Sequence, residues 1–165
     1  MSNYPYVPYG TTVHGEDEIN AVVNVLKTST QMGKNVRELE EKVAGLYNKK
    51  YGIGVNSGSS ALYLAADLLN YDEGTEIITP ALTFSTTVAP LVKRKWIPAF
   101  VDVEEGTYNI DAAKIEEMIS SKTKAMVIPN LIGNLPNWKQ IREIAYKHNI
   151  FLFDVSADTI GPEID

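Results

Sequence analysis

The sequence predicts an α/β fold in which a mainly parallel sheet lies between two layers of helices. Strand-like apolar runs alternate with helical segments over most of the chain, which is typical of parallel strands joined by crossover helices. Runs such as Ala125-Met126-Val127-Ile128 are apolar at every position, which indicates strands covered on both faces. Right-handed crossovers then distribute the helices over both sides of the sheet, so we expect a three-layer α/β/α arrangement.

The residues before the sheet are expected to form an arm and two helices. Residues 1–12 are rich in tyrosine, proline and glycine, which favours an extended arm that packs on a partner subunit. Apolar side chains spaced three and four residues apart predict amphipathic helices over 16–27 and 36–47. Strands are then predicted at 51–55, 76–79, 97–101, 125–128 and 150–154, and helices at 60–69, 85–93, 112–119 and 138–148.

With 165 residues and 44% hydrophobic content, the chain is long enough for one α/β domain and too short for two typical ones. We therefore expect a single domain over 1–165, in which residues 1–50 form the arm and first helices and residues 51–165 form the sheet portion. The sequence ends shortly after the last predicted strand, without a helix to cover it. A truncated sheet is the expected result.

The composition argues against several classes of protein. No apolar run approaches the ~20 residues that span a bilayer, and the N-terminus lacks a signal peptide, so we expect a cytoplasmic protein without a membrane partner. The net charge of −6 comes without a basic stripe, which argues against a nucleic-acid partner. The lack of cysteine and the wide separation of His14 and His148 argue against a metal site.

The most informative local feature is the serine-rich turn between the first predicted strand and the helix at 60–69. It contains Ser57, Gly58, Ser59 and Ser60. Backbone N–H groups at a helix N-terminus lack intrahelical partners, the helix dipole is positive there, and serine hydroxyls add donors. Taken alone, the turn fits a phosphate site and an ordinary serine N-cap equally well.

Further motifs follow the other predicted strands, and together they resemble a known family. They are Asn56 to Leu62, Thr79 to Thr87, Phe100 to Val103, Thr123 to Ala125, Asn130 to Asn134 and Ser156 to Gly161. In this order they resemble the DegT-type nucleotide-sugar aminotransferases, which are pyridoxal 5'-phosphate (PLP) enzymes of fold type I. A typical member is considerably longer, so the resemblance is to the N-terminal portion only and implies an incomplete large domain.

The resemblance implies a cofactor-binding role for particular residues. Gly58, Ser59 and Ser60 match the turn that binds the cofactor phosphate, in agreement with the anion-site interpretation above. Phe84 matches an aromatic side chain whose ring stacks on the pyridine ring of the cofactor. Asp158 matches a polar position beside that ring.

The loop after the fourth predicted strand is implied to contact substrate. Asn130 and Asn134 match positions that line the sugar pocket in the family. The segment Asn-Leu-Ile-Gly-Asn is also typical of a turn, so a purely structural role stays open at this stage.

Two departures from the family pattern concern the chemistry. The family has an aspartate six residues before the closing glycine, where its charge keeps the pyridine nitrogen protonated; counting back from Gly161 gives Val155, preceded by Asp154. Asp154 is therefore a further candidate for cofactor binding, although successive side chains of a strand point to opposite faces, so that it reaches the pyridine only through a bulge or a shortened loop. The family's Schiff-base lysine lies beyond Asp165, so no catalytic residue is assigned here.

The sequence therefore predicts the N-terminal part of a PLP-dependent aminotransferase that acts on nucleotide-linked keto-sugars in cell-surface polysaccharide biosynthesis. The implied partners are a nucleotide-sugar substrate, an amino-acid donor and a second copy of the chain in a homodimer. Two alternatives remain open. One is a sugar 3-dehydrase relative that uses pyridoxamine phosphate and carries a loop similar to Gly133-Asn134. The other is a catalytically inactive, truncated fragment.

Overall fold

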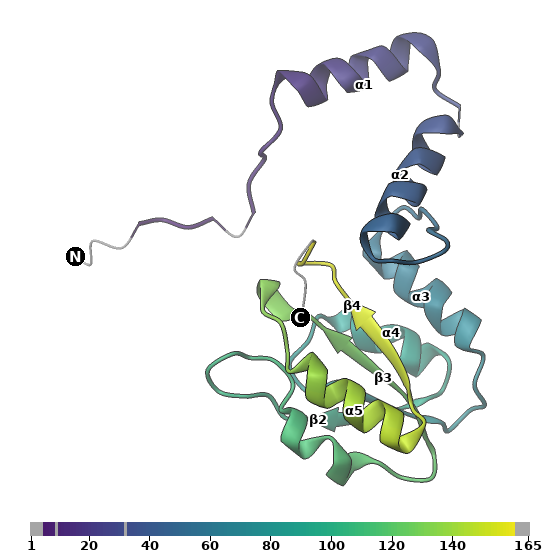
Figure 1. The fold of residues 1–165 in the computed structure, drawn as a ribbon, viewed down its shortest axis with the longest axis vertical. Coiled ribbons are helices and arrows are strands. Elements are labelled where there is room, and N and C mark those ends of the chain that lie inside the picture. The colour runs from purple at the N-terminus through teal and green to yellow at the C-terminus, as the bar shows by residue number, and fades with distance from the viewer. Residues whose placement is uncertain (1–4, 9, 32, 161–165) are drawn as a thin grey trace. The chain divides into compact units, whose positions relative to one another are not determined.

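The computed structural model describes residues 5–8, 10–31 and 33–160. The chain divides into two compact units, residues 1–54 and residues 55–165. The first unit contains helices, and the second contains a sheet with helices on both faces (Figure 1).

The described residues at the start of the first unit have no regular secondary structure before Glu16. This agrees with an extended arm, although part of the predicted arm, residues 1–4 and 9, lies outside the described residues. Helices α1 (Glu16–Thr28) and α2 (Lys34–Leu46) then follow, close to the predicted ranges. The N–H of Gly15 donates to Oε2 of Glu18 (2.7 Å), which satisfies one free donor at the start of α1.

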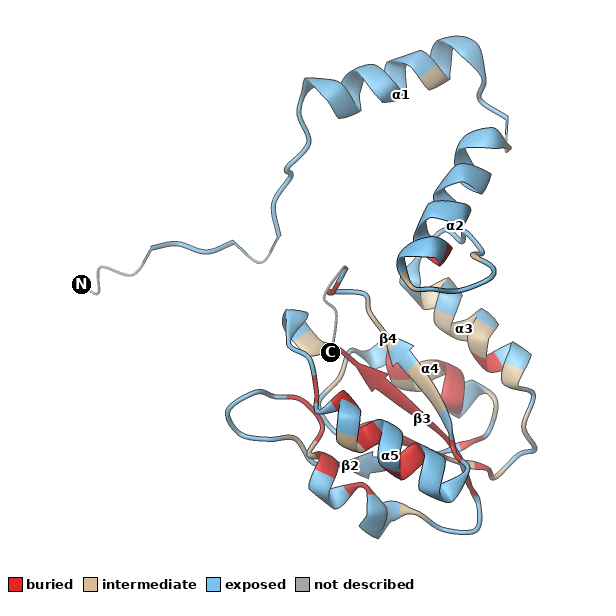
Figure 2. Cartoon of the chain, in the orientation of Figure 1, coloured by how far each residue is buried: buried red, intermediate tan, exposed pale blue. Residues whose placement is uncertain are grey.

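Both helices have an apolar stripe, and both stripes are exposed (Figure 2). Such stripes are normally buried, since they supply most of the stability of a helix in a protein. The exposed members are Ile19, Val22, Val23 and Leu26 in α1, and Val36, Leu39, Val43 and Leu46 in α2.

The predicted strand at 51–55 is not among the described strands, so this prediction is wrong. The N–H of Gly54 donates instead to Oε1 of Glu40 in α2 (2.7 Å). A Cβ atom at residue 52 would overlap the backbone of Glu40, so this close approach requires glycine. A strand is stable only when a neighbour satisfies its backbone groups, and none of the described strands pairs with this segment.

The second unit is built on a four-stranded sheet in the order β2-β1-β3-β4. All neighbouring strands are parallel, which confirms the predicted α/β class. The pairing of β3 with β4 runs without a shift from Ala125 opposite Phe151 to Pro129 opposite Val155. The strands are β1 (Glu76–Pro80), β2 (Ile97–Val101), β3 (Thr123–Pro129) and β4 (Phe151–Val155).

Helices cover the two faces of the sheet, as the sequence predicts (Figure 1). On one face, α3 and α4 bury Ala66 and Leu91 against Ile77, Ala125 and Val127 of the strands. We call this the α3/α4 face. The bounds of the helices are α3 (Gly58–Leu69), α4 (Ser85–Lys93) and α5 (Trp138–His148).

Helix α5 covers the other face, which we call the α5 face. Its side chains Ile141 and Ile144 are buried against Ile78, Met126 and Ile128. Neighbouring residues of one strand thus contribute to different cores, as the alternation of strand side chains requires.

The predicted helix at 112–119 is instead two short 3₁₀ helices, η1 (Ala112–Lys114) and η2 (Glu116–Met118). Residues three apart point the same way in a 3₁₀ helix. Ala112 and Ile115 are both buried in the core of the α5 face, so tertiary packing favours the tighter turn over the predicted α-helix.

Candidate functional site

Helices α3 and α4 run in the same direction, so their N-termini lie at one end of the sheet. At the other end, Nη2 of Arg94, just after α4, donates to Oδ1 of Asn70, just after α3 (2.9 Å), and Nη1 pairs with Asp67 (3.6 Å). Because α4 follows β1 directly, its first residue, Ser85, lies towards the carboxyl ends of the strands. Ligands of parallel α/β sheets bind at this end.

The N-terminus of α3 has free hydrogen-bond donors. Ser57 caps the helix by accepting a bond from the N–H of Ser60 (3.2 Å), and the Ser60 hydroxyl donates to Oδ1 of Asn56 (2.6 Å). Within the described residues, the N–H groups of Gly58 and Ser59 have no acceptor, and no atom lies within 4 Å of where a Cβ of residue 58 would be. An anion such as a phosphate group fits this turn chemically.

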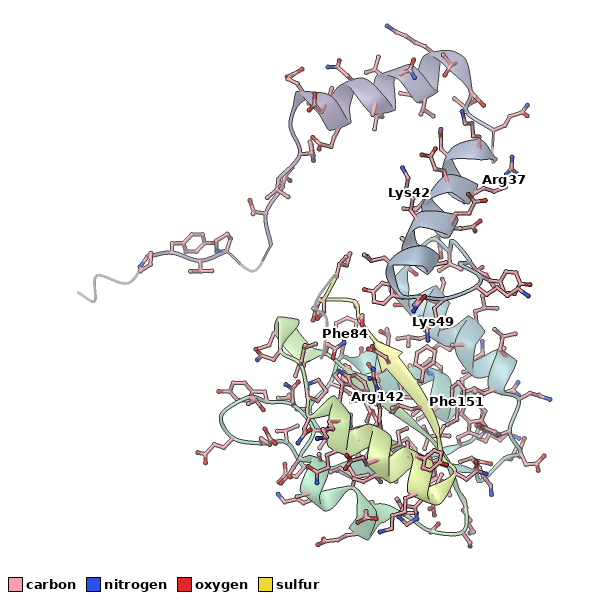
Figure 3. All side chains as sticks on the ribbon, in the orientation of Figure 1. Arg37, Lys42, Lys49, Phe84, Arg142 and Phe151 are labelled. Atoms are coloured by element: carbon pink, nitrogen blue, oxygen red, sulfur yellow. The ribbon has the colours of Figure 1, made fainter. Side chains whose placement is uncertain are left out.

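Phe84 is the residue that precedes α4, and its ring is largely in solvent. It is 66% exposed, although a phenylalanine is usually buried. Its side chain is labelled in Figure 3. Its backbone is extended (φ −69°, ψ 141°), and its carbonyl accepts a bond from the N–H of Thr87 (2.9 Å). The turn fixes the backbone of Phe84 and leaves the ring available as a platform for a flat ligand.

Val155 and Asp154 lie on opposite faces of the sheet. Val155 packs against the apolar core of the α3/α4 face. Asp154 lies two residues after Leu152 in β4, so the two side chains point to the same face of the sheet. Leu152 packs on the α5 face. Since the pairing of β3 with β4 contains no shift, no bulge turns Asp154 back towards α3 and α4.

Asn130 lies at the carboxyl end of β3 and is only 3% exposed. Its Nδ2 donates to Oδ1 of Asp154 (2.9 Å) and to Oγ of Ser156 (2.9 Å), and its Oδ1 accepts a bond from Nε1 of Trp138 (2.8 Å). These bonds join the ends of β3 and β4 to the start of α5. The arrangement agrees with a structural role for Asn130, and its predicted contact with substrate stays a prediction.

Asn134 and Asp158 remain exposed at the same end of the sheet. Nδ2 of Asn134 donates to the carbonyl of Thr107 (3.1 Å), and Oδ2 of Asp158 accepts a bond from the N–H of Ile132 (3.3 Å). The loops after β2, β3 and β4 are therefore linked to one another. The motif from Ser156 onward ends at Gly161, which lies outside the described residues.

Ile132, in the turn η3 (Leu131–Gly133), has a left-handed backbone conformation (φ 50°, ψ 32°). A β-branched residue is a real outlier there, and such outliers concentrate at functional sites. Its side chain is 64% exposed, so apolar packing does not explain the conformation. The sequence indicates a turn at Ile-Gly-Asn, in which positive φ is expected of the glycine. It does not predict that the isoleucine takes positive φ as well.

Among the described residues, no group of three or more acidic or histidine side chains is arranged to hold a metal ion. Within the same residues, every helix is too short or too polar to cross a membrane.

A parallel sheet of this topology, with helix N-termini at its carboxyl end, is shared by fold-type-I PLP enzymes. Residues 12–165 match the sequence profile of the DegT/DnrJ/EryC1/StrS aminotransferase family, and the chain belongs to this family. The resemblance inferred from the ordered motifs is thereby confirmed.

Individual relatives are similar over almost the whole of this chain. It is 32% identical to the GDP-4-keto-6-deoxy-D-mannose 3-dehydratase of Yersinia pseudotuberculosis, over 96% of this chain and 42% of that protein. It is 35% identical to the lipopolysaccharide biosynthesis protein RfbH of Salmonella typhimurium, over 94% of this chain and 38% of that protein. The chain thus spans about two fifths of the length of these relatives.

Solved structures give the same result. A crystal structure of GDP-4-keto-6-deoxymannose-3-dehydratase with a trapped PLP-glutamate geminal diamine superposes with a TM-score of 0.90 at 30% identity, over 97% of this chain and 43% of that one. NtdA of Bacillus subtilis with bound pyridoxamine phosphate (PMP) superposes with a TM-score of 0.83 at 28% identity, over 89% and 35% of the two chains. These relatives hold PLP or PMP.

Proposed function

We propose that this chain is the N-terminal part of a PLP-dependent enzyme that transfers an amino group to a nucleotide-linked keto-sugar. The observation that carries the proposal is the N-terminus of α3, where the N–H groups of Gly58 and Ser59 have no acceptor among the described residues. The relatives support it, since they include a sugar 3-dehydratase solved with PLP-glutamate and the spore coat polysaccharide biosynthesis protein SpsC of Bacillus subtilis.

The residues present fit two parts of the cofactor. The free N–H groups of Gly58 and Ser59 suit its phosphate, which carries negative charge and accepts hydrogen bonds. The hydroxyl of Ser60, which donates to Asn56 in this structure, is proposed to turn to the phosphate when the cofactor binds. The exposed ring of Phe84 suits the face of its pyridine ring, because aromatic rings stack favourably when offset. When bound, PLP supplies an electron sink for charge that develops on the substrate. The role of this chain is to bind and orient it.

Substrate recognition and assembly extend the proposal. Asn134 is exposed in the loop after β3 and offers an amide to a sugar hydroxyl, although its Nδ2 also contacts Thr107. A nucleotide-sugar, an amino-acid donor and a second copy of the chain are the proposed partners. The exposed apolar stripes of α1 and α2 support association with a second copy.

A second candidate function is a PMP-dependent sugar 3-dehydratase. It is favoured by the relatives, several of which are 3-dehydratases, and by the loop at Gly133-Asn134. Incubation of the purified protein with PMP, glutamate and a nucleotide-linked 4-keto-sugar separates the two functions. An amino sugar formed from glutamate supports the aminotransferase, and a 3-deoxy sugar supports the dehydratase. A third candidate, an inactive fragment, predicts that neither product forms.

Cofactor binding by α3 is tested with Ser59→Ala and Ser60→Ala together. Each hydrogen bond to a charged group contributes about 1.5–3 kcal/mol, so we expect the dissociation constant for PMP to rise at least tenfold, or roughly 1.4 kcal/mol. Titration calorimetry measures it. Ser121→Ala, at an exposed serine outside this turn, is the control and should bind as the wild type does. Equal affinity in all variants would contradict a phosphate site at α3.

A further inference from the structure

The phosphate end and the ring face of the cofactor have fitting residues in this chain, but among the described residues no carboxylate is placed to pair with the ring nitrogen. In an apolar site, a nearby negatively charged acceptor favours protonation of the pyridine nitrogen, because the apolar environment by itself disfavours the charged form. The sequence offers Asp154, next to the position where the family has its aspartate.

Asp154 is unsuited to this role for two independent reasons. Its side chain lies on the α5 face, whereas the N-termini of α3 and α4 belong to helices on the opposite face. Its Oδ1 also accepts hydrogen bonds from Nδ2 of Asn130 (2.9 Å) and from Oγ of Ser156 (2.9 Å). Asn130 is buried and fixed by Trp138, so a rotation of Asp154 towards the other face would leave a buried amide donor short of an acceptor.

Other carboxylates near the carboxyl ends of the strands also have hydrogen-bond or ion-pair partners. Asp102, after β2, pairs with Lys114 of η1 (3.8 Å) and accepts a bond from the N–H of Val103 (2.8 Å). Asp158 accepts a bond from the N–H of Ile132 (3.3 Å). None of these contacts directs a carboxylate to the α3/α4 face.

The position that does lie on the α3/α4 face is Val155. It packs against a core that includes Ala66 of α3, Leu91 of α4 and Val127 of β3. The phenol of Tyr71 packs against this core, and burial raises its pKa, so it stays uncharged at neutral pH. The end of β4 therefore presents an apolar surface on this face.

We propose that the cofactor ring binds with its nitrogen towards Val155 and without a carboxylate partner from residues 5–160, so that these residues bind the cofactor but do not support protonation of its ring. This inference rests on the proposed function, because it assumes that PLP or PMP binds at the N-terminus of α3. It goes further by assigning Val155 as the residue that determines the protonation of the bound ring.

The test compares wild type, Val155→Asp and Asp154→Asn, each with bound PMP. PMP lacks the reactive aldehyde of PLP, so no lysine is needed for binding. The ultraviolet absorbance of the bound ring, followed against pH, gives the pKa of its nitrogen, and calorimetry gives the dissociation constant. Asp154→Asn retains an oxygen acceptor for Asn130 while it removes the charge, and it is the matched control.

We expect the pKa of the ring nitrogen to be lower in the wild-type complex than in free PMP, because the surroundings are apolar. Val155→Asp should raise the pKa of the bound nitrogen by about 1 to 3, the usual effect of an adjacent opposite charge. Asp154→Asn should leave it unchanged.

A fall in the pKa of the bound nitrogen in Asp154→Asn would overturn the inference, since Asp154 would then be the partner, and would leave the proposed function intact. Even if Val155→Asp does not fold, comparing the pKa of the bound nitrogen in the wild type and in Asp154→Asn still tests the inference. A bound nitrogen that titrates no lower than in free PMP would also overturn the inference. Absence of PMP binding by every variant would overturn the proposed function together with it.

Discussion

The indole Nε1 of Trp138 donates a 2.8 Å hydrogen bond to Oδ1 of Asn130, and both side chains are buried. Trp138 begins α5, and Asn130 follows β3, so this bond holds the first turn of α5 against the carboxyl end of the sheet. Through Asn130 it also fixes Asp154 and Ser156.

Trp138→Phe should lower the free energy of unfolding. The change retains an aromatic ring but leaves the buried Oδ1 of Asn130 without its donor, which costs about 1–3 kcal/mol. Urea unfolding followed by circular dichroism measures the loss. Trp138→Phe combined with Asn130→Leu should lose less than the sum of the two single changes, because the buried acceptor is gone. Additive losses would show that the bond contributes little.

Ile132→Asn should stabilise the protein. Asparagine adopts the left-handed conformation more readily than a β-branched residue, for which that region costs about 1–2 kcal/mol. Thermal unfolding should therefore occur at a higher temperature. Val92→Asn, at an exposed β-branched residue inside α4, is the comparison and should bring no gain. A lower unfolding temperature for Ile132→Asn would mean that the isoleucine side chain makes stabilising contacts.

Much of the sheet could be predicted from the sequence, because its pattern is local. Apolar runs identify β1 to β4 closely, and the alternation of side chains predicts that Asp154 and Val155 lie on opposite faces. The regular pairing of β3 with β4 and the two separate cores agree with this. Gly58 and Ser59 were predicted from the free donors of a helix N-terminus and Phe84 from the family resemblance, and their cofactor-binding roles stay predictions.

The remaining features depend on tertiary contacts that no local pattern encodes. The run at 51–55 has the composition of a strand but lacks a pairing partner among the described strands. The segment 112–119 has helical spacing, yet burial of Ala112 and Ile115 favours 3₁₀ turns. The bond between Trp138 and Asn130 joins residues whose side chains meet only when the sheet is formed.

Ser57→Ala separates the two functions of the turn at α3. Ser57 accepts the N–H of Ser60 (3.2 Å), and loss of an N-cap costs about 1 kcal/mol. Ser59 makes no such bond within the described residues, so Ser59→Ala should leave the free energy of unfolding nearly unchanged in the absence of ligand. Chemical denaturation of both variants without phosphate compounds provides the comparison. Equal losses would indicate that Ser59 has a structural role as well.

Gly52→Ala should destabilise the first unit. The added methyl group would overlap the backbone of Glu40, and overpacking of this kind costs about 1–3 kcal/mol. Gly45→Ala is the matched control, because residue 45 lies inside α2 with no atom within 4 Å of the added Cβ. That change should stabilise the helix by about 0.5–1 kcal/mol. Hydrogen exchange of the α2 amides measures both effects, and equal protection in the two variants would contradict the close approach.

Glu116 should make the stability of the second unit depend on pH in acid. Its Oε1 lies 2.8 Å from Nζ of Lys147 and 2.7 Å from Nε2 of His148, and these partners hold the pKa of Glu116 below its ordinary value of 4.5. A carboxyl group whose pKa is lower in the folded state stabilises it above the unfolded pKa, and this contribution is lost as the pH falls through the folded pKa. Stability should therefore decline below about pH 4.5, towards the lower folded value.

Glu116→Gln should flatten this part of the pH profile, because glutamine does not ionise. Glu117→Gln is the control, since Glu117 is the adjacent residue and makes no ion pair within the described structure. Thermal unfolding of the three proteins between pH 3 and pH 6 tests the prediction. If the wild type and Glu116→Gln lose stability in parallel as the pH falls, the bonds to Lys147 and His148 do not persist in solution. Because those bonds join η2 to the end of α5, such a result would also mean that the end of α5 is held by its apolar contacts, while the bond between Trp138 and Asn130 holds its first turn.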